Sequence, residues 1–175
     1  MGRDKAELVV AGERLADRAA RVLMAVCDPV LEVGPGRSEL DVVADDPRAG
    51  PLAAVVTGAR ALHTRGHDGA VLVLGVDLPF VDARLLGLLV HHPAVETVVP
   101  VAGGMRQSCC ARYAPDAVAV AADLVDRGER AMHALLSVVP VVEVAEDEWR
   151  AVAPADALTD LDTPEDLIRL GVDDR

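Results

Sequence analysis

The fold class of this chain is decided by the segment Val71-Leu72-Val73-Leu74-Gly75-Val76-Asp77-Leu78-Pro79-Phe80. It contains most of an unbroken apolar run, Ala70–Val76, which is typical of a strand buried on both faces of a sheet. We therefore expect a parallel, central strand here, with Asp77 at its carboxyl end. Ligands bind outside the carboxyl ends of such strands in α/β proteins, so Asp77 is the first candidate functional residue.

Helical and strand patterns alternate on both sides of this segment. Apolar residues recur at helical spacing over Glu13–Val26, and Pro51 opens a second helical pattern that continues to Leu62. Asp82 is placed to cap a helix that ends at Val90. This alternation predicts one domain, residues 1–175, with a three-layer α/β architecture and a mostly parallel sheet. The remaining predicted helices cover Pro115–Asp126, Arg130–Ser137 and Thr163–Leu170, and the remaining strands cover Val30–Val33, Thr97–Val101, Ser108–Tyr113 and Val138–Val144.

The composition argues against several classes of protein. The 175 residues include 17 Lys and Arg against 29 Asp and Glu, and the formal net charge of −12 repels nucleic-acid phosphates and anionic lipids. No apolar run approaches the roughly 18 residues that a membrane span needs, and no secretory leader is recognisable. We therefore expect a cytoplasmic protein that binds neither nucleic acid nor membranes.

The cysteine and histidine patterns argue against a metal cluster and against covalent catalysis. Cys27, Cys109 and Cys110 lack paired CxxC spacing, and the adjacent pair lacks the His and Asp signature of a nucleophile. Buried thiols in a reducing compartment are their default interpretation. His63 and His67 lie four residues apart, but nearby glycines interrupt the helix that would align them as metal ligands.

Three segments in the first half of the chain are candidates for binding an anionic substrate. The Asp77 carboxylate can hold Mg²⁺ beside a phosphate, or it can cap a turn. Lys5 can neutralise a triphosphate as a point charge, or it can belong to a solvated tail. Gly50-Pro51-Leu52 follows Asp45 and Asp46, and it can form a substrate loop or an ordinary helix start.

A fourth candidate lies near the C-terminus. Asp160 and Asp162 are two residues apart just before a predicted helix, so an extended backbone points both carboxylates to one side. They can complete a cation site. Alternatively, Asp162 or Thr163 caps the helix, whose first turn carries Glu165 and Asp166 to complement the helix dipole.

Five short motifs in order give the chain a family resemblance. They are Gly2-Arg3-Asp4-Lys5, Gly50-Pro51-Leu52, the Val71–Phe80 segment with Asp77-Leu78-Pro79, Gly128-Glu129-Arg130, and Asp160-Leu161-Asp162-Thr163-Pro164-Glu165-Asp166-Leu167. Together they resemble the molybdenum cofactor guanylyltransferase family over nearly the whole chain. The resemblance implies a Rossmann-like nucleotidyltransferase fold of the nucleotide-diphospho-sugar transferase type. It also implies transfer of GMP from Mg-GTP to the terminal phosphate of molybdopterin, with release of pyrophosphate.

The resemblance assigns roles to individual residues. Lys5 is similar to the family lysine that neutralises the triphosphate, and Asp77 to the magnesium ligand. Asp45 or Asp46 is similar to the acidic residue of the nucleotide site, while Asp160 and Asp162 match a motif on the pterin or metal side that more often carries asparagine. The implied partners are Mg²⁺, GTP and molybdopterin, and also molybdoenzymes or cofactor-maturation proteins.

The chain departs from the family pattern in two places. The family begins with a buried strand and a Leu-Ala-Gly-Gly loop, and this sequence starts after both, so we expect the sheet to lack its first strand and the true start codon to lie upstream. In addition, Gln107-Ser108-Cys109-Cys110 replaces a proline-leucine pair near the acceptor site. Two alternatives remain open, a CTP-using molybdopterin cytidylyltransferase and a non-catalytic truncated homologue. A sugar-nucleotide pyrophosphorylase would usually be longer.

Overall fold

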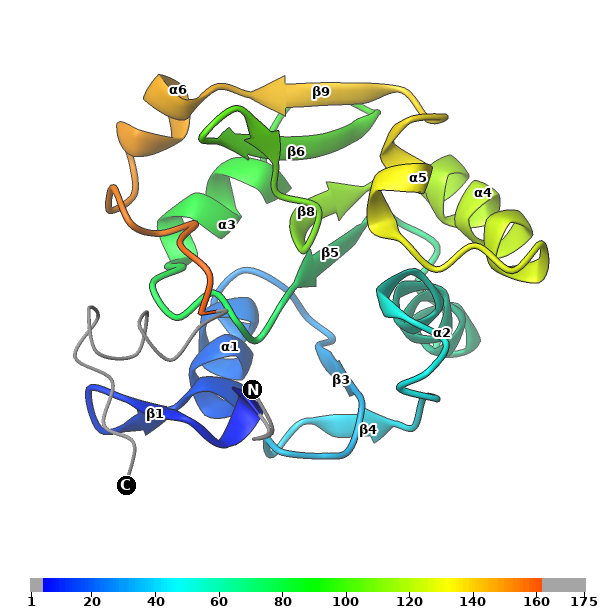
Figure 1. The fold of residues 1–175 in the computed structure, drawn as a ribbon, viewed down its shortest axis with the longest axis horizontal. Helices are drawn as coiled ribbons and strands as arrows, with labels where there is room; N and C mark the ends of the chain where they lie inside the picture. Colours follow the sequence, from blue (N-terminus) through cyan, green and yellow to red (C-terminus); the bar gives the residue numbers. More distant parts are fainter. Residues whose placement is uncertain (1–4, 162–175) are drawn as a thin grey trace.

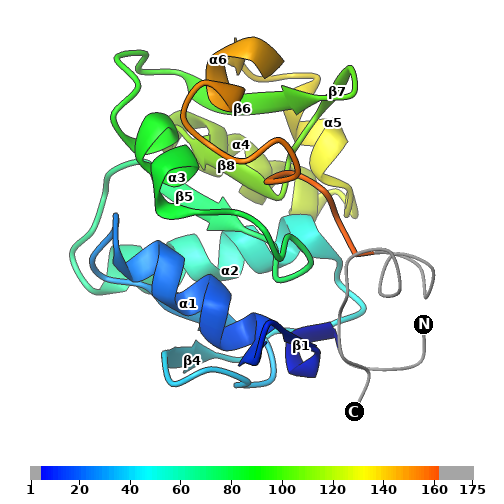
Figure 2. The ribbon, with the colours of Figure 1, turned by 90° about the vertical axis from the view of Figure 1, so that its left-hand side faces the viewer.

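Helices lie on both sides of a mixed sheet in the computed structural model, which describes residues 5–161 (Figure 1). One side carries the helices α1 (Leu15–Met24), α3 (Ala83–Val90) and α6 (Glu146–Arg150), and the other carries α2 (Pro51–Thr64), α4 (Pro115–Asp126) and α5 (Met132–Leu136). The view turned by 90° shows the three layers (Figure 2). The expected three-layer α/β architecture is therefore confirmed.

The main sheet has five strands, and two of them run antiparallel to their neighbours. Its strands are β5 (Val71–Leu74), β6 (Thr97–Ala102), β7 (Met105–Arg106), β8 (Cys110–Tyr113) and β9 (Val141–Val144). β8 lies between β5 and β6 and is antiparallel to both, while β9 is parallel to β6. The strands β5, β6 and β9 consequently share one direction, so their carboxyl ends meet at one edge.

The expected central position of the Ala70–Val76 strand is wrong for the part of the chain that the structure describes. β5 pairs only with β8 there, in antiparallel register, and all four of its residues are partly exposed. The strands β3 (Leu31–Val33) and β4 (Asp41–Val43) form a separate two-stranded parallel sheet. The apolar run marks a strand that suits a central position, but within residues 5–161 no strand pairs with its second edge.

Several boundaries follow the sequence pattern closely. The side chain of Asp82 accepts hydrogen bonds from the backbone N–H groups of Arg84 and Leu85, so it caps α3 as expected.

The sequence did not indicate several short elements. They are β4, the hairpin of β1 (Val9–Val10) with β2 (Glu13–Arg14), the 3-10 helix η1 (Lys5–Glu7) and α6. The predicted helix Thr163–Leu170 lies outside the described residues. No helix among residues 5–161 is long and apolar enough to cross a membrane.

A small apolar cluster joins the two ends of the described chain. It consists of the buried residues Leu8, Val10, Leu15 and Leu161, with Val76 and Phe80 packed against it. Leu161 is fully buried, and the backbone N–H of Leu15 donates to the carbonyl of Leu8 at 2.9 Å. The cluster therefore fixes the N-terminal segment and the C-terminal segment against the loop that follows β5.

Replacing Leu161 with alanine should destabilise the protein by about 2–5 kcal/mol, because a fully buried leucine leaves a cavity that neighbours fill only in part. Urea denaturation followed by circular dichroism measures the change. Val152→Ala is the control, since Val152 is 37% exposed. Equal stability of the two variants would show that this cluster does not hold the chain ends.

Candidate functional site

Lys5 and Asp77 meet at the carboxyl end of β5. The Nζ atom of Lys5 lies 3.8 Å from Oδ2 of Asp77, and the two side chains are 28% and 35% exposed. Both groups are thus partly shielded from water while remaining open to a ligand. Lys5 is also the sole lysine of the sequence. The structure brings together the two residues that the sequence suggested for phosphate and metal binding.

The antiparallel ladder of β5 and β8 continues for one more pair beside the Asp77 carboxylate. The backbone N–H of Gly75 donates to the carbonyl of Cys109 at 2.6 Å. A Cβ atom at position 75 would lie 2.6 Å from Oδ1 of Asp77 and 3.1 Å from the Cβ of Cys109. A methyl group at position 75 would therefore force the Asp77 carboxylate to move from its present position.

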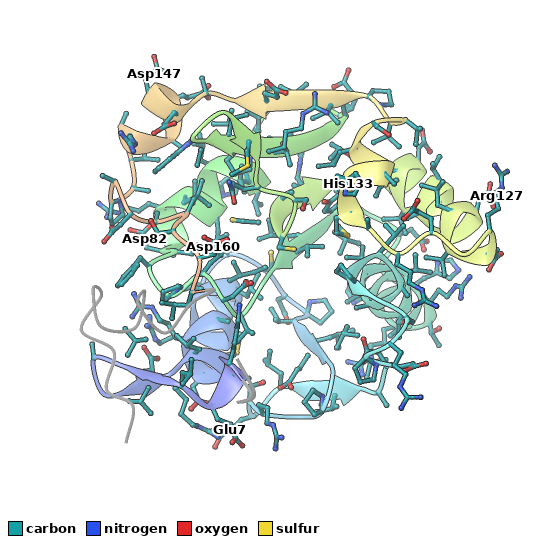
Figure 3. All side chains as sticks on the ribbon, viewed as in Figure 1. Glu7, Asp82, Arg127, His133, Asp147 and Asp160 are labelled. Carbon is teal, nitrogen blue, oxygen red and sulfur yellow. The ribbon has the colours of Figure 1, made fainter. Side chains whose placement is uncertain are left out.

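The C-terminal segment is anchored to the same strand end. The backbone N–H of Leu161 donates to the carbonyl of Asp77 at 2.9 Å. Its neighbour Asp160 is exposed and is labelled in Figure 3 on the loop that follows α6. The structure thereby places Asp160 one residue from a direct contact with Asp77. Asp162, the second carboxylate of the motif, lies outside the described residues.

The two adjacent cysteines border the site and are not activated. Burial, together with the Asp77 carboxylate, raises the pKa of the Cys109 thiol, and burial raises the pKa of the fully buried Cys110 thiol to about 12. Both thiols therefore stay protonated near neutral pH, and a protonated thiol is a poor nucleophile. Cys110 is the buried strand residue that was expected, whereas Cys109 is partly exposed and lies in the turn before β8.

The Gly50-Pro51-Leu52 segment packs against the Gly128-Glu129-Arg130 segment. The backbone N–H of Leu52 donates to the carbonyl of Arg130 at 3.2 Å, and a Cβ at position 50 would lie 2.9 Å from the Cβ of Arg130. Gly50 has a positive φ of 86°, which glycine adopts without strain. Two motifs that are far apart in the sequence are thus neighbours beside α2.

A shallow hollow next to Cys109 adjoins this contact. Its volume is about 410 Å³, and its lining includes Ser108, Cys109, Arg130 and His133. Figure 3 labels His133 on α5. At the start of α5, the N–H groups of Ala131 and Arg130 donate to the Glu129 carboxylate and lower its pKa.

Asp45 and Asp46 occupy the loop between β4 and α2. The carboxylate of Asp46 accepts the backbone N–H of Arg48 at 2.9 Å, so it already stabilises a turn within this loop. Asp45 is partly buried, whereas Asp46 is exposed. The structure joins Lys5, Asp77 and the Asp160 segment directly, and it places Asp45 and Asp46 on a separate loop.

The sequence reasoning missed what positions the site. Gly75 and Leu161 bind neither charge nor phosphate, yet they fix the Asp77 carboxylate and the Asp160 segment. The sequence does indicate Gly75, because a glycine inside an apolar strand often marks a place where another segment approaches closely. Within residues 5–161 no cluster of three or more His, Cys, Asp and Glu residues could hold a metal by protein ligands alone.

The fold and this strand-end site define an α/β nucleotidyltransferase. Residues 1–148 match the family model of the MobA-like NTP transferase domain, and the chain therefore belongs to this family of nucleotidyltransferase enzymes. A relative from Opitutus terrae, named "Probable molybdenum cofactor guanylyltransferase", is 34% identical over 166 residues, which are 86% of this chain and 81% of the relative. A relative of the same name from Mycobacterium bovis is 30% identical over 175 residues, covering 94% of this chain and 86% of the relative.

Solved structures have the same fold. Molybdopterin-guanine dinucleotide biosynthesis protein A from Archaeoglobus fulgidus aligns with a TM-score of 0.75 at 22% identity, covering 97% of this chain and 89% of that one. The 2-C-methyl-D-erythritol 4-phosphate cytidylyltransferase from Thermus thermophilus aligns with a TM-score of 0.66 at 19% identity, covering 95% and 91%. These similarities confirm the Rossmann-like nucleotidyltransferase fold.

Replacing Gly75 with alanine should destabilise the protein by about 1–3 kcal/mol, because the new methyl group overlaps the Asp77 carboxylate and presses on the Cβ of Cys109. Chemical denaturation measures this loss. Gly69→Ala serves as the control, since a Cβ atom there meets nothing within 4 Å. Equal stability of Gly75→Ala and the control would show that the contacts around position 75 are loose.

Proposed function

We propose that this chain transfers GMP from GTP to the terminal phosphate of molybdopterin, with Mg²⁺, and releases pyrophosphate. The observation that carries the proposal is the Lys5–Asp77 pair, 3.8 Å apart at the carboxyl end of β5. Ligands bind at this edge of an α/β sheet. The names of the two relatives from Opitutus terrae and Mycobacterium bovis support this choice of substrate.

The reaction is a phosphoryl-type substitution at the α-phosphorus of GTP. An oxygen of the acceptor phosphate forms the new P–O bond as the bond from the α-phosphorus to the bridging oxygen breaks. Pyrophosphate leaves with the electron pair of the broken bond. Such transfers need positioning and charge neutralisation more than covalent help, so the protonated thiols of Cys109 and Cys110 take no part.

Asp77 suits the role of a magnesium ligand. Mg²⁺ prefers oxygen ligands, and it is commonly held by one or two carboxylates together with substrate phosphates and water. The Asp77 side chain is 35% exposed, which leaves its oxygens accessible to a hydrated ion. When bound, Mg²⁺ neutralises the negative charge that develops on the phosphate oxygens.

Lys5 supplies the positive charge of the protein at this site. Its ammonium group lies beside Asp77, so a triphosphate bound there faces one fixed cation. The rest of the chain carries a net negative charge, which makes a local cation necessary for holding a polyanion.

The remaining candidate residues surround this pair in our proposal. Asp160 and Asp162 face the acceptor, while Asp45 or Asp46 contributes to the nucleotide site before Gly50. The whole chain acts as one nucleotidyltransferase domain in the cytoplasm, in keeping with the free thiols of Cys27, Cys109 and Cys110. Molybdoenzymes or cofactor-maturation proteins then receive the product.

Replacing Asp77 with asparagine should reduce Mg²⁺-dependent release of pyrophosphate from GTP by at least about 100-fold, because the charge at the metal is lost. The assay contains the protein, molybdopterin and MgGTP, and a parallel reaction contains CTP. Asp123→Asn on α4 is the matched control and should keep full activity. Faster turnover with CTP than with GTP would contradict the proposed nucleotide, and unchanged turnover in Asp77→Asn would contradict the metal role.

Replacing Lys5 with alanine should weaken GTP binding by about 10–100-fold, since a contact to a charged group is worth about 1.5–3 kcal/mol. Isothermal titration of the protein with GTP measures the affinity directly and needs no turnover. Lys5→Arg keeps the positive charge and should recover most of the affinity. Equal GTP affinity in Lys5→Ala and the unaltered chain would remove Lys5 from the nucleotide site.

A further inference from the structure

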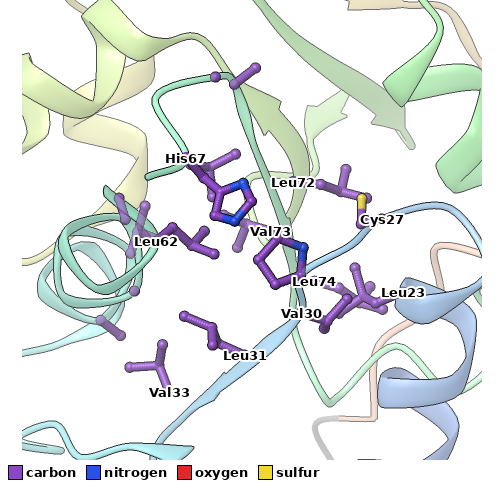
Figure 4. Close-up of a pocket in the computed structure, with 18 of the residues that line it drawn as sticks. Leu23, Cys27, Val30, Leu31, Val33, Leu62, His67, Leu72, Val73 and Leu74 are labelled. Atoms are coloured by element: carbon purple, nitrogen blue, oxygen red, sulfur yellow. The ribbon is translucent and has the colours of Figure 1, made fainter. Parts of the chain in front are cut away.

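The loop that follows β3 is organised around the carboxylate of Glu32. Leu31 and Val33 turn their side chains into the cavity of about 670 Å³ between β3 and β5 (Figure 4). Because side chains alternate along a strand, Glu32 points to the other side. There its carboxylate accepts the backbone N–H groups of Arg37 and Ser38, each at 2.7 Å, and the Ser38 hydroxyl at 2.7 Å. One carboxylate therefore fixes the backbone at Arg37.

Hydrogen bonds keep the Glu32 carboxylate ionised. Burial alone raises the pKa of this group, but donors from Ser38, Arg37 and Gly36 outweigh burial and hold the pKa below the ordinary value of a glutamate. These donors are backbone N–H groups and a hydroxyl. The guanidinium of Arg37 extends to a different carboxylate, that of Glu7, with Nη1 3.3 Å from Oε1. The loop thus keeps its shape at neutral pH, and the side chain of Arg37 projects from it.

The short helix η1 joins this loop to the Lys5–Asp77 pair. Glu7 contacts Arg37 in the loop after β3. Lys5, two residues earlier in η1, contacts Asp77 in the segment after β5. The carboxyl ends of β3 and β5 therefore lie at the same edge of the structure, which is where α/β proteins bind ligands. A nucleotide whose phosphates lie at Lys5 can extend along this edge toward Arg37.

The Arg37–Glu7 pair suits a nucleobase better than a phosphate. A phosphate brought to Arg37 would lie beside the Glu7 carboxylate, and the two negative charges would repel each other. Guanine is uncharged and carries both kinds of hydrogen-bonding group. Its O6 and N7 atoms accept from a guanidinium, and its N2 amino group donates to a carboxylate.

Both side chains of this pair are accessible to a ligand. The Arg37 side chain is 37% exposed and the Glu7 side chain is 55% exposed. An ion pair between such exposed groups is weak, so the two side chains can turn to a ligand at small cost. A guanidinium also has five N–H donors, which is more than one carboxylate accepts.

We propose that Arg37 recognises the guanine base of GTP by donating to O6 and N7, and that Glu7 accepts a hydrogen bond from the N2 amino group. This inference rests on the proposed function, because it takes the phosphates of GTP to lie at Lys5 and Asp77. It gives a physical reason for selecting GTP over CTP. Cytosine presents an amino donor where guanine presents O6, and a guanidinium has only donors to offer it.

The test measures the affinities of GTP, CTP and 7-deaza-GTP by isothermal titration. In 7-deaza-GTP a carbon replaces N7, so one of the two acceptors is missing. The chains are the unaltered protein, Arg37→Ala, Arg37→Lys and the control Arg127→Ala. Lysine keeps the positive charge but lacks the planar fork of donors. Arg127 is exposed at the C-terminal end of α4, so its removal changes the net charge equally, away from η1 (Figure 3).

We expect Arg37→Ala to weaken GTP binding by about 10–100-fold and to leave CTP binding unchanged, because a bidentate contact to guanine is lost. The unaltered chain should bind 7-deaza-GTP more weakly than GTP, whereas Arg37→Ala should bind the two equally. Arg37→Lys should not restore the affinity for GTP. Arg127→Ala should bind all three nucleotides as the unaltered chain does.

Three outcomes would overturn the proposal. Equal losses of GTP and CTP affinity in Arg37→Ala would show that Arg37 does not read the base. Equal GTP affinity in all the chains would remove Arg37 from the site. Equal affinities of the unaltered chain for GTP and 7-deaza-GTP would exclude the N7 contact independently of any variant. The proposed function fails differently, since a chain that binds GTP through Arg37 but releases no pyrophosphate with molybdopterin would contradict the transfer and leave the base contact standing.

Discussion

The site depends on the burial of Leu161 beside the N-terminal segment. Leu161 packs with Leu8, Val10 and Leu15, and its backbone N–H bonds to the carbonyl of Asp77 at 2.9 Å. One apolar contact therefore brings together segments that lie more than 70 residues apart in the sequence. Lys5 and Asp160 reach the end of β5 because their neighbours are buried there, since their own charges favour exposure to water.

The second constraint is that charged side chains must be positioned by uncharged ones. Gly75 leaves room for the Asp77 carboxylate and the Cys109 side chain, and the carbonyl of Cys109 accepts the Gly75 N–H. The Lys5–Asp77 distance of 3.8 Å is long for a tight ion pair, and both groups are partly exposed. Such a pair contributes little to stability. Its position at a strand end is compatible with the binding role proposed for it.

Much of the architecture could be predicted from local patterns, and the reasons for success and failure are physical. α4 and the Asp82 cap follow from helical periodicity and from a side chain that satisfies free N–H groups, which are properties of one segment. The edge position of β5 could not be predicted from its own residues, because pairing depends on the neighbouring strand. β4 was missed because it has only three residues, Asp41-Val42-Val43, and two of them are exposed, so no buried apolar run marks it.

For the site too, the sequence indicated features that belong to one segment and missed those that depend on contacts between distant segments. Asp77 became a candidate because a carboxylate after an apolar strand is visible in the sequence, and Lys5 because a cation can neutralise a triphosphate; the family resemblance supported both. The contact between them depends on Leu161 and Gly75, whose roles appear only when distant segments are packed. Asp45 and Asp46 show the limit of this approach, since the carboxylate of Asp46 stabilises its own turn through the Arg48 N–H.

The negative net charge of the protein makes positive charge at the end of β5 important for binding phosphates. A chain of net charge −12 repels a nucleoside triphosphate and an acceptor phosphate over most of its surface. Binding two such anions side by side requires positive charge at one point, and the sole lysine lies beside the carboxylate best placed for a divalent cation. Without both cations, the phosphates would repel each other and the protein. In the proposed function, the combination of Lys5 with a metal at Asp77 is therefore the simplest arrangement by which this acidic chain would join two phosphates.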